Sequence, residues 1–136
     1  METYTKLIFG EKELFAFADT NSTSIFDYIN PMKQKDLRKI LSNVPESVEL
    51  IMVYGSALGD FVRNDSDLDL AVVSKNPKCY DRSTLSTLAL DTAVDIKIFP
   101  SVDNLATQAE NFFPTAVEIV KKGLPVYYMG KEVVLS

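Results

Sequence analysis

Three apolar segments between residues 48 and 99 constrain the fold more strongly than any other feature of the sequence. They are VELIMVY at 48–54, LDLAVV at 68–73 and AVDIKIF at 93–99. Each is rich in residues that favour strands, and each is short enough to be one strand of a sheet. A predicted helix at 81–91 lies between the second and the third. This order predicts an α/β or α+β sheet with helices packed on it.

Amphipathic patterns predict the helices. Residues 34–44 place four apolar side chains on one helical face, namely Leu37, Ile40, Leu41 and Val44. The helix at 81–91 is expected to turn three side chains inward, namely Leu85, Leu88 and Ala89.

End signals predict two more helices. Ser101 is a predicted N-cap for a helix that runs to about residue 112. Pro114 suits the first turn of a further helix. The end of that helix is indicated by Lys121, Lys122 and Gly123. Residues 124–135 predict two short strands, and residues 5–18 are compatible with a hairpin around Gly10.

Composition limits the chemistry that is open to this chain. Its 136 residues are 46% apolar, which suits one domain over residues 1–136. A net charge of −5 argues against a broad basic face for nucleic acid. Because there is no histidine and only one cysteine, Cys79, the sequence excludes imidazole catalysis, an internal disulfide and a zinc site built from a cysteine cluster. Catalysis must therefore use carboxylates, hydroxyls, lysine or a carboxylate-bound metal.

Location in the cell is predicted from what the sequence does not contain. The first residues, METYTKL, lack a signal-peptide pattern, and no segment has the length of a bilayer span. We therefore expect a soluble cytoplasmic protein without a membrane partner.

Two aspartates stand at the start of the second apolar segment. In an extended strand Asp67 and Asp69 leave the same face, with Cα atoms roughly 6.5 Å apart. Two carboxylates about 5 Å apart repel by roughly 3 kcal/mol at an effective dielectric of 20, so burial requires a counter-charge. If Asp95 points the same way from a neighbouring strand, three carboxylates converge. An isolated D-x-D pair is, however, more often plain solvated surface.

The counter-ion that suits oxygen ligands alone is Mg²⁺ or Mn²⁺. Two such ions clamp the attacking and the departing oxygen of a phosphoryl displacement. Gly55 and Ser56 follow the first apolar segment, where a glycine allows the backbone to approach a polyphosphate and N–H groups and a hydroxyl donate to it. Taken alone, Gly55-Ser56 is most often just a turn.

Together, Gly55-Ser56, Asp67-Leu68-Asp69-Leu70 and Asp95 resemble the signature of the DNA polymerase β nucleotidyltransferase superfamily. More narrowly, the chain is similar to the minimal nucleotidyltransferases of prokaryotes. The resemblance implies the α+β nucleotidyltransferase fold, a small mixed sheet with helices packed on it, with a core at 34–129. Residues 1–33 are then an extension whose role is not readable. Ala57, Leu58 and Gly59 depart from the family pattern, which usually has a basic residue and a later glycine there.

By this resemblance Asp67, Asp69 and Asp95 hold two Mg²⁺ ions, and Gly55 and Ser56 hold the phosphates of an NTP. The implied reaction transfers a nucleoside monophosphate, AMP from ATP being favoured, to a hydroxyl. Arg63 and Lys97 are candidate phosphate contacts, although exposed cations are more often solvated surface.

The acceptor is left open by the sequence. Only residues 100–136 follow the third predicted strand, too few for a separate acceptor-binding domain, so a partner protein or an oligomer is expected to supply that surface. Similar minimal enzymes act as antitoxins that add AMP to a tyrosine of an all-helical HEPN toxin. The alternatives are a catalytically inactive binding protein on the same scaffold and an enzyme that modifies a small hydroxylated molecule.

Overall fold

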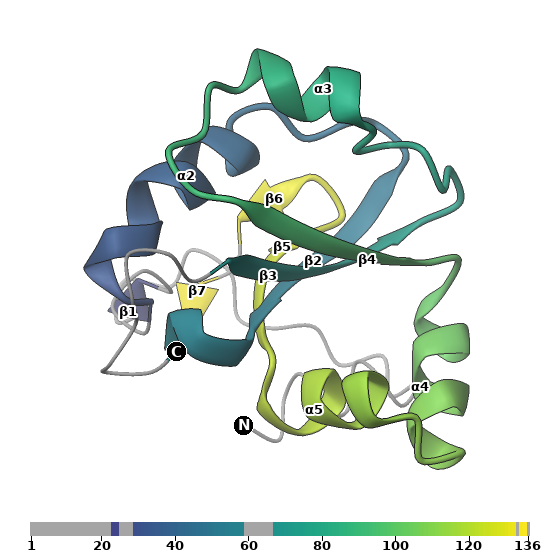
Figure 1. Ribbon diagram of the computed structural model, residues 1–136. Coiled ribbons are helices and arrows are strands. Elements are labelled where there is room, and N and C mark those ends of the chain that lie inside the picture. The colour runs from purple at the N-terminus through teal and green to yellow at the C-terminus, as the bar shows by residue number, and fades with distance from the viewer. Residues whose placement is uncertain (1–22, 25–28, 59–66, 133, 136) are drawn as a thin grey trace.

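The computed structural model describes residues 23–24, 29–58, 67–132 and 134–135 (Figure 1). The helices are α2 (Pro31–Leu41), the 3₁₀ turn η2 (Gly55–Leu58), α3 (Arg82–Thr87), α4 (Val102–Glu110) and α5 (Pro114–Lys122). The strands are β1 (Thr23–Ser24), β2 (Val48–Tyr54), β3 (Leu68–Ser74), β4 (Val94–Phe99), β5 (Leu124–Tyr128), β6 (Lys131–Glu132) and β7 (Val134–Leu135).

Five strands form one mixed sheet in the order β4-β3-β2-β5-β6. Strands β3 and β4 are parallel, and the other neighbours are antiparallel. A parallel pair needs a crossover connection, which α3 supplies between β3 and β4. The short strands β1 and β7 pair with each other in a separate ribbon. The predicted α+β class, with a small mixed sheet and helices on it, is confirmed.

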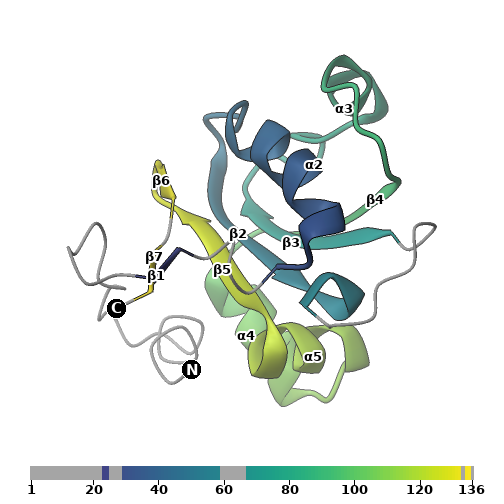
Figure 2. The same cartoon turned by 90° about the vertical axis from the view of Figure 1, so that its left-hand side faces the viewer.

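Helices lie on both faces of the sheet (Figure 2). Helices α2 and α3 lie on one side, and α4 and α5 lie on the other. The central strands β2 and β3 are buried almost along their whole length, because both of their faces are covered. Their side chains join those of α2, α4 and α5 in one cluster of buried apolar residues.

The first described helix starts and ends at sites set by local side chains. The Asn30 side chain accepts a hydrogen bond from Met32 N at 3.0 Å, and Pro31 occupies the first turn. At the other end, the side chains of Ser42 and Asn43 donate to carbonyls one turn back and compete with further helical bonds. The predicted helix at 34–44 is therefore found at Pro31–Leu41, and Val44 lies beyond its end.

The prediction for 81–91 is wrong in part. Helix α3 ends at Thr87, and Ala89, expected to point inward, is exposed with φ of 52°. Leu85 and Leu88 are only half-buried. Ser86 and Thr87 donate to carbonyls three residues back, and such local hydroxyl bonds weaken a helix. These hydroxyl residues therefore shorten the helix that the leucine spacing predicts.

The remaining elements agree closely with the sequence. The three apolar segments form β2, β3 and β4, and Ser101 caps α4 by accepting from Asn104 N at 2.9 Å. Helix α4 ends at Glu110, two residues before its expected end, whereas Pro114 and Gly123 bound α5 as predicted. The C-terminal segment holds a third short strand, β7, besides the two predicted. The hairpin expected at 5–18 lies outside the described residues.

Membrane-spanning helices are absent from the part of the chain that the structure describes, where every helix is too short or too polar to traverse a bilayer.

A buried carboxylate joins α2 to the segment before β4. Asp36 is 1% exposed and accepts from Asp91 N and Thr92 N at 2.9 Å each and from Thr92 Oγ1 at 2.6 Å. Burial alone would raise the pKa of Asp36, but the hydrogen bonds from Thr92 and Asp91 lower it below its ordinary value. The ionised form therefore stabilises the fold, and this contribution is lost as the pH falls through the lowered pKa.

We expect Asp36→Ala to reduce the free energy of unfolding by about 2–4 kcal/mol at neutral pH, because three donors then lose their acceptor. Urea unfolding followed by circular dichroism measures this. Lys35→Ala is the matched control: Lys35 lies in the same helix but forms only an exposed ion pair with Asp91, at 2.9 Å. The control should leave the urea midpoint unchanged. Equal loss in both variants would contradict the assignment.

Candidate active site

Three side chains form a row across the sheet, one on each of three adjacent strands. Tyr54, the last residue of β2, is the Cα partner of Asp69 on β3. Asp69 in turn is the Cα partner of Asp95 on the parallel strand β4. Partners in neighbouring strands point to the same face, so the two carboxylates stand side by side next to the tyrosine. The strand register therefore sets Asp69 beside Asp95, whereas the predicted gathering of Asp67, Asp69 and Asp95 into one metal-binding group is not found among the described residues.

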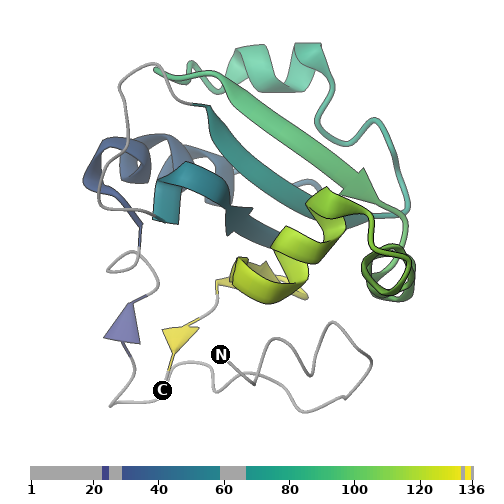
Figure 3. The same ribbon diagram turned by 60° about the horizontal axis from the view of Figure 1, so that its bottom comes forward.

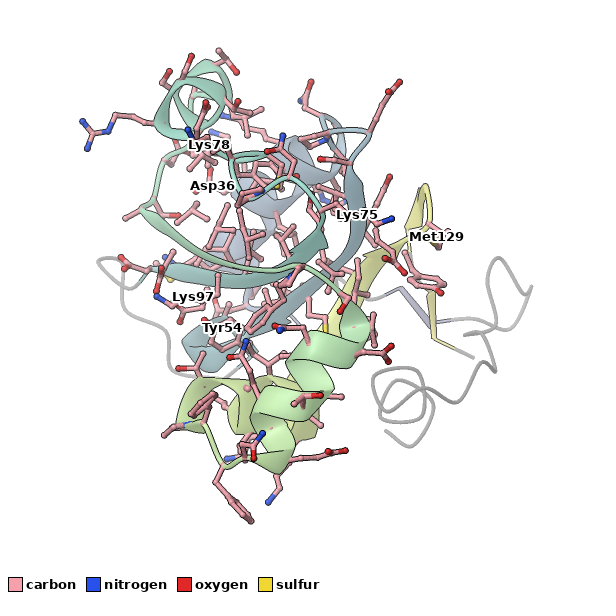
Figure 4. All side chains as sticks on the ribbon, turned by 90° about the vertical axis from the view of Figure 1, so that its right-hand side faces the viewer. Asp36, Tyr54, Lys75, Lys78, Lys97 and Met129 are labelled. Atoms are coloured by element: carbon pink, nitrogen blue, oxygen red, sulfur yellow. The ribbon has the colours of Figure 1, made fainter. Side chains whose placement is uncertain are left out.

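This row faces α4 and α5. Figure 4 shows Tyr54 and Lys97 on that side of the sheet, with Asp36 on the other side. Glu118 of α5 lies near enough to Asp69 and Tyr54 for its charge to act on both. Neither Tyr54 nor Glu118 is among the site residues predicted from the sequence. Tyr54 could have been found, because it ends a predicted strand directly before the Gly55-Ser56 turn. No pattern in the sequence predicts that Glu118 lies near this face.

Asp67 stands at the entry of β3, as the predicted strand bounds of 68–73 imply. Strand β3 begins at Leu68, and Asp67 immediately precedes it with an exposed side chain. Its charge nevertheless acts on Asp69. Of the D-x-D pair, Asp69 is thus a residue of β3 and Asp67 is an exposed residue just before it. The two do not lie on one face of the same strand, as an extended strand through both would require.

Gly55 makes room for the Asp69 carboxylate. Its φ is +76°, and a Cβ built on it would lie 2.6 Å from Asp69 Oδ2. Both features favour glycine, since any other residue would be strained and would displace the carboxylate. Gly55 opens η2, which also contains Ser56, and the carbonyl of Ala57 accepts from Asn30 N at 2.8 Å. The predicted Gly55-Ser56 turn therefore lies directly beside Asp69.

Electrostatic repulsion is present at this row. Burial, and after it the charge of Asp95, raises the pKa of Asp69 above its ordinary value. Asp67 and Glu118 act in the same direction, and Lys97 acts against them. Burial and nearby carboxylates, Asp69 first among them, raise the pKa of Tyr54 to about 12. The site thus holds more negative charge than its surroundings balance, which is a favourable setting for a cation.

Lys97 supplies part of the missing positive charge. Its Nζ lies 3.4 Å from Asp95 Oδ1, and both side chains are about half-exposed. No group of three cysteine or acidic side chains in the described ranges is gathered closely enough to hold a metal ion. The donor chemistry nonetheless suits Mg²⁺ or Mn²⁺, because the donors are carboxylate oxygens whose charges repel one another.

Comparison with known families identifies this arrangement. Residues 35–130 match the family described as Polymerase beta, Nucleotidyltransferase. The chain belongs to this family. The match covers β2, β3 and β4, and with them every residue of the predicted site, and it gives the protein a nucleotidyltransferase type of function. Searches of curated proteins and of solved structures gave no significant match.

The structure of this nucleotidyltransferase domain brings Gly55, Asp69 and Asp95 together, and the charge of the exposed Asp67 acts on Asp69. Their catalytic and metal-binding roles stay predictions. Lys97, a predicted phosphate contact, lies at the same face but pairs with Asp95. Arg63, the other predicted contact, lies outside the described residues, as does Gly59.

Asp69→Asn should stabilise the metal-free protein against heat at neutral pH, because it removes a charge that its neighbours repel. A raised folded pKa means that stability falls as the pH rises between the ordinary carboxyl pKa and the raised value. The variant should lose this part of the pH dependence. If the row binds Mg²⁺ as predicted, MgCl₂ should raise the melting temperature of the wild type, and the variant should lose this rise. Differential scanning fluorimetry with and without MgCl₂ over pH 3–8 measures both effects, and an identical profile for the two proteins would refute the proposed repulsion.

Gly55→Ala should weaken Mg²⁺-ATP binding at least tenfold, because the new Cβ displaces Asp69 Oδ2. Gly130→Ala is the matched control, since Gly130 also has a positive φ, +90°, but no atom lies within 4 Å of the point that a Cβ would occupy there. Both variants should lose about 1–2 kcal/mol of stability through backbone strain. Only Gly55→Ala should lose ligand affinity in isothermal titration calorimetry. Equal affinity in both variants would show that the close contact has no functional effect.

Proposed function

We propose that this protein is a Mg²⁺-dependent enzyme that transfers AMP from ATP to a hydroxyl group of an acceptor. The observation that carries the proposal is the parallel register of Asp69 with Asp95, with the Gly55 turn packed against the first of these carboxylates. Family membership supports the type of reaction. Carboxylates are the available acid-base and metal-binding groups in a chain that has no histidine.

Each residue of the row has a distinct part in this proposal. Asp69 and Asp95, with Asp67 beside them, hold Mg²⁺, and the Gly55-Ser56 turn lets the backbone approach the β and γ phosphates. When bound, Mg²⁺ supplies neutralisation of the charge that develops on the phosphate oxygens. The acceptor oxygen forms a bond to the α-phosphorus, the bond to pyrophosphate breaks, and the hydroxyl proton passes to solvent. When ATP binds, the Lys97 ammonium group leaves Asp95 and donates to a phosphate oxygen instead.

For the acceptor, we propose a tyrosine of a HEPN-family toxin, which makes the protein an antitoxin. Support comes from the similarity of the Gly-Ser and aspartate motifs to those of minimal nucleotidyltransferases with this role. A hydroxyl on a partner protein also agrees with the exposed position of Asp95 at the sheet edge, where a large acceptor has access. The purified product of a neighbouring gene, incubated with labelled ATP and MgCl₂, is the direct test.

A second candidate is a binding protein that covers its partner without chemistry. The ion pair of Lys97 with Asp95 favours it, because a lysine satisfies the carboxylate without any metal. The departures at Ala57 and Leu58 from the usual residues of the turn favour it as well.

Asp95→Asn discriminates between the two candidates. If transfer is the function, the variant should lose label incorporation at least a hundredfold and should no longer neutralise the partner. Asp103→Asn, which changes an exposed carboxylate of α4, should keep both activities. Neutralisation that survives in Asp95→Asn without any label would instead establish the binding protein.

A further inference from the structure

The order of the site residues across the sheet indicates the side from which the acceptor arrives. The inference rests on the proposed function. The Gly55 turn follows β2, Asp69 is on β3, and Asp95 is on β4, the outermost strand (Figure 3). Phosphates at the turn therefore lie on the inner side of the carboxylates. The open side of Asp95 is the edge of the sheet.

At that edge the backbone of β4 has hydrogen-bonding groups that no other described strand uses. Leu68 N donates to Ala93 O at 2.9 Å, and the register is parallel from there to Phe99. Backbone groups alternate in direction along a strand, so those of Asp95 and Lys97 also face β3. Those of Ile96 and Ile98 face outward. Among the described strands, none pairs with this edge.

A pocket of about 430 Å³ lies directly beside the same strand. It is lined by both strand residues and residues of α4 and α5, among them Ile96, Lys97, Ile98, Gln108, Phe113 and Ala116. Phe113 is 55% exposed, although it is a large apolar residue. An apolar side chain that entered here would cover surface that is now in water.

We propose that β4 takes up an extended segment of a protein acceptor as an additional strand, with the hydroxyl-bearing residue opposite Asp95. The next residue on the same face of that segment, two positions away, lies opposite Lys97 and puts an apolar side chain into the pocket. Main-chain bonds to Ile96 and Ile98 hold the segment, and the pocket selects its sequence.

The register of β4 would bring the hydroxyl of such a segment close to the Asp95 carboxylate. Because the backbone groups of Asp95 face β3, an antiparallel partner residue opposite it forms a non-hydrogen-bonded pair. Such pairs have the closer Cα separation, about 4.5 Å, and their side chains lie on the same face. An acceptor hydroxyl delivered this way lies beside the carboxylate without any movement of the domain.

The same edge is protected against permanent pairing. Lys97 in the middle of β4 is the kind of charged residue that discourages association of open edges. A second copy of this chain at the edge would cover Asp95, which the proposed reaction needs to be accessible. We therefore assign the edge to a transient acceptor segment rather than to a dimer.

A nine-residue peptide library with a central Tyr, Ser or Thr is the probe, incubated with the full chain, MgCl₂ and ATP labelled at the α-phosphate. Labelled peptides should be enriched in apolar residues two positions from the hydroxyl. Ile98→Pro removes an outward N–H without removing a bond to β3 and should lower peptide labelling at least tenfold. Ile98→Ala removes side-chain atoms but keeps the N–H, and it should lose clearly less than the proline variant.

Melting temperature and Mg²⁺-ATP affinity are measured on the same samples. If Ile98→Pro does not fold, Phe113→Ala serves instead and should abolish the apolar selection. Equal labelling by the proline and alanine variants, or label on glycerol or an RNA 3′-hydroxyl but on no peptide, overturns strand addition and leaves the proposed function intact. A dimer by light scattering that Ile98→Pro abolishes would assign the edge to a second copy. Absence of Mg²⁺-ATP binding in the wild type overturns both proposals.

Discussion

Repulsion between Asp69 and Asp95 is the interaction on which the candidate site depends. The parallel register of β3 and β4 places the two carboxylates opposite each other on one face of the sheet. Partial burial of Asp69 strengthens the effect, since water no longer screens the charges fully. The fold thereby keeps a local electrostatic cost that a bound cation would relieve.

Two aspartates illustrate how surroundings decide the state of one chemical group. Asp36 receives three hydrogen bonds, and its pKa is lowered. Asp69 is partly buried and has like charges for neighbours, and both raise its pKa. The first carboxylate contributes to stability, whereas the second reduces it at neutral pH. The difference between these two carboxylates follows from their partners rather than from burial alone.

Much of this arrangement was predictable from the sequence because the signals are local. Strand-rich apolar segments fix β2, β3 and β4, and side-chain caps such as Ser101 fix helix ends. The sequence predicted that Asp69 meets Asp95 only if the two strands are neighbours and the side chains point the same way. Strand order and strand direction depend on the whole chain, so the sequence alone did not decide this. Glu118 was not predictable, because its approach to the carboxylates depends on how α5 packs on the sheet. Ala89 was misplaced because hydroxyl side chains end α3 earlier than the leucine spacing suggests.

Helix α2 contacts both halves of the site from the opposite face of the sheet. At its N-terminal end, Asn30 N donates a hydrogen bond to Ala57 O in the turn after β2. In its middle, Asp36 accepts hydrogen bonds from the backbone of the segment that precedes β4. Lys39 adds a bond to the carbonyl of Ala89 at 2.7 Å. Helix α2 thus helps to fix the distance between the turn at Gly55 and β4, the strand that carries Asp95. The relative position of the candidate site residues is therefore inherited from an element on the opposite face of the sheet.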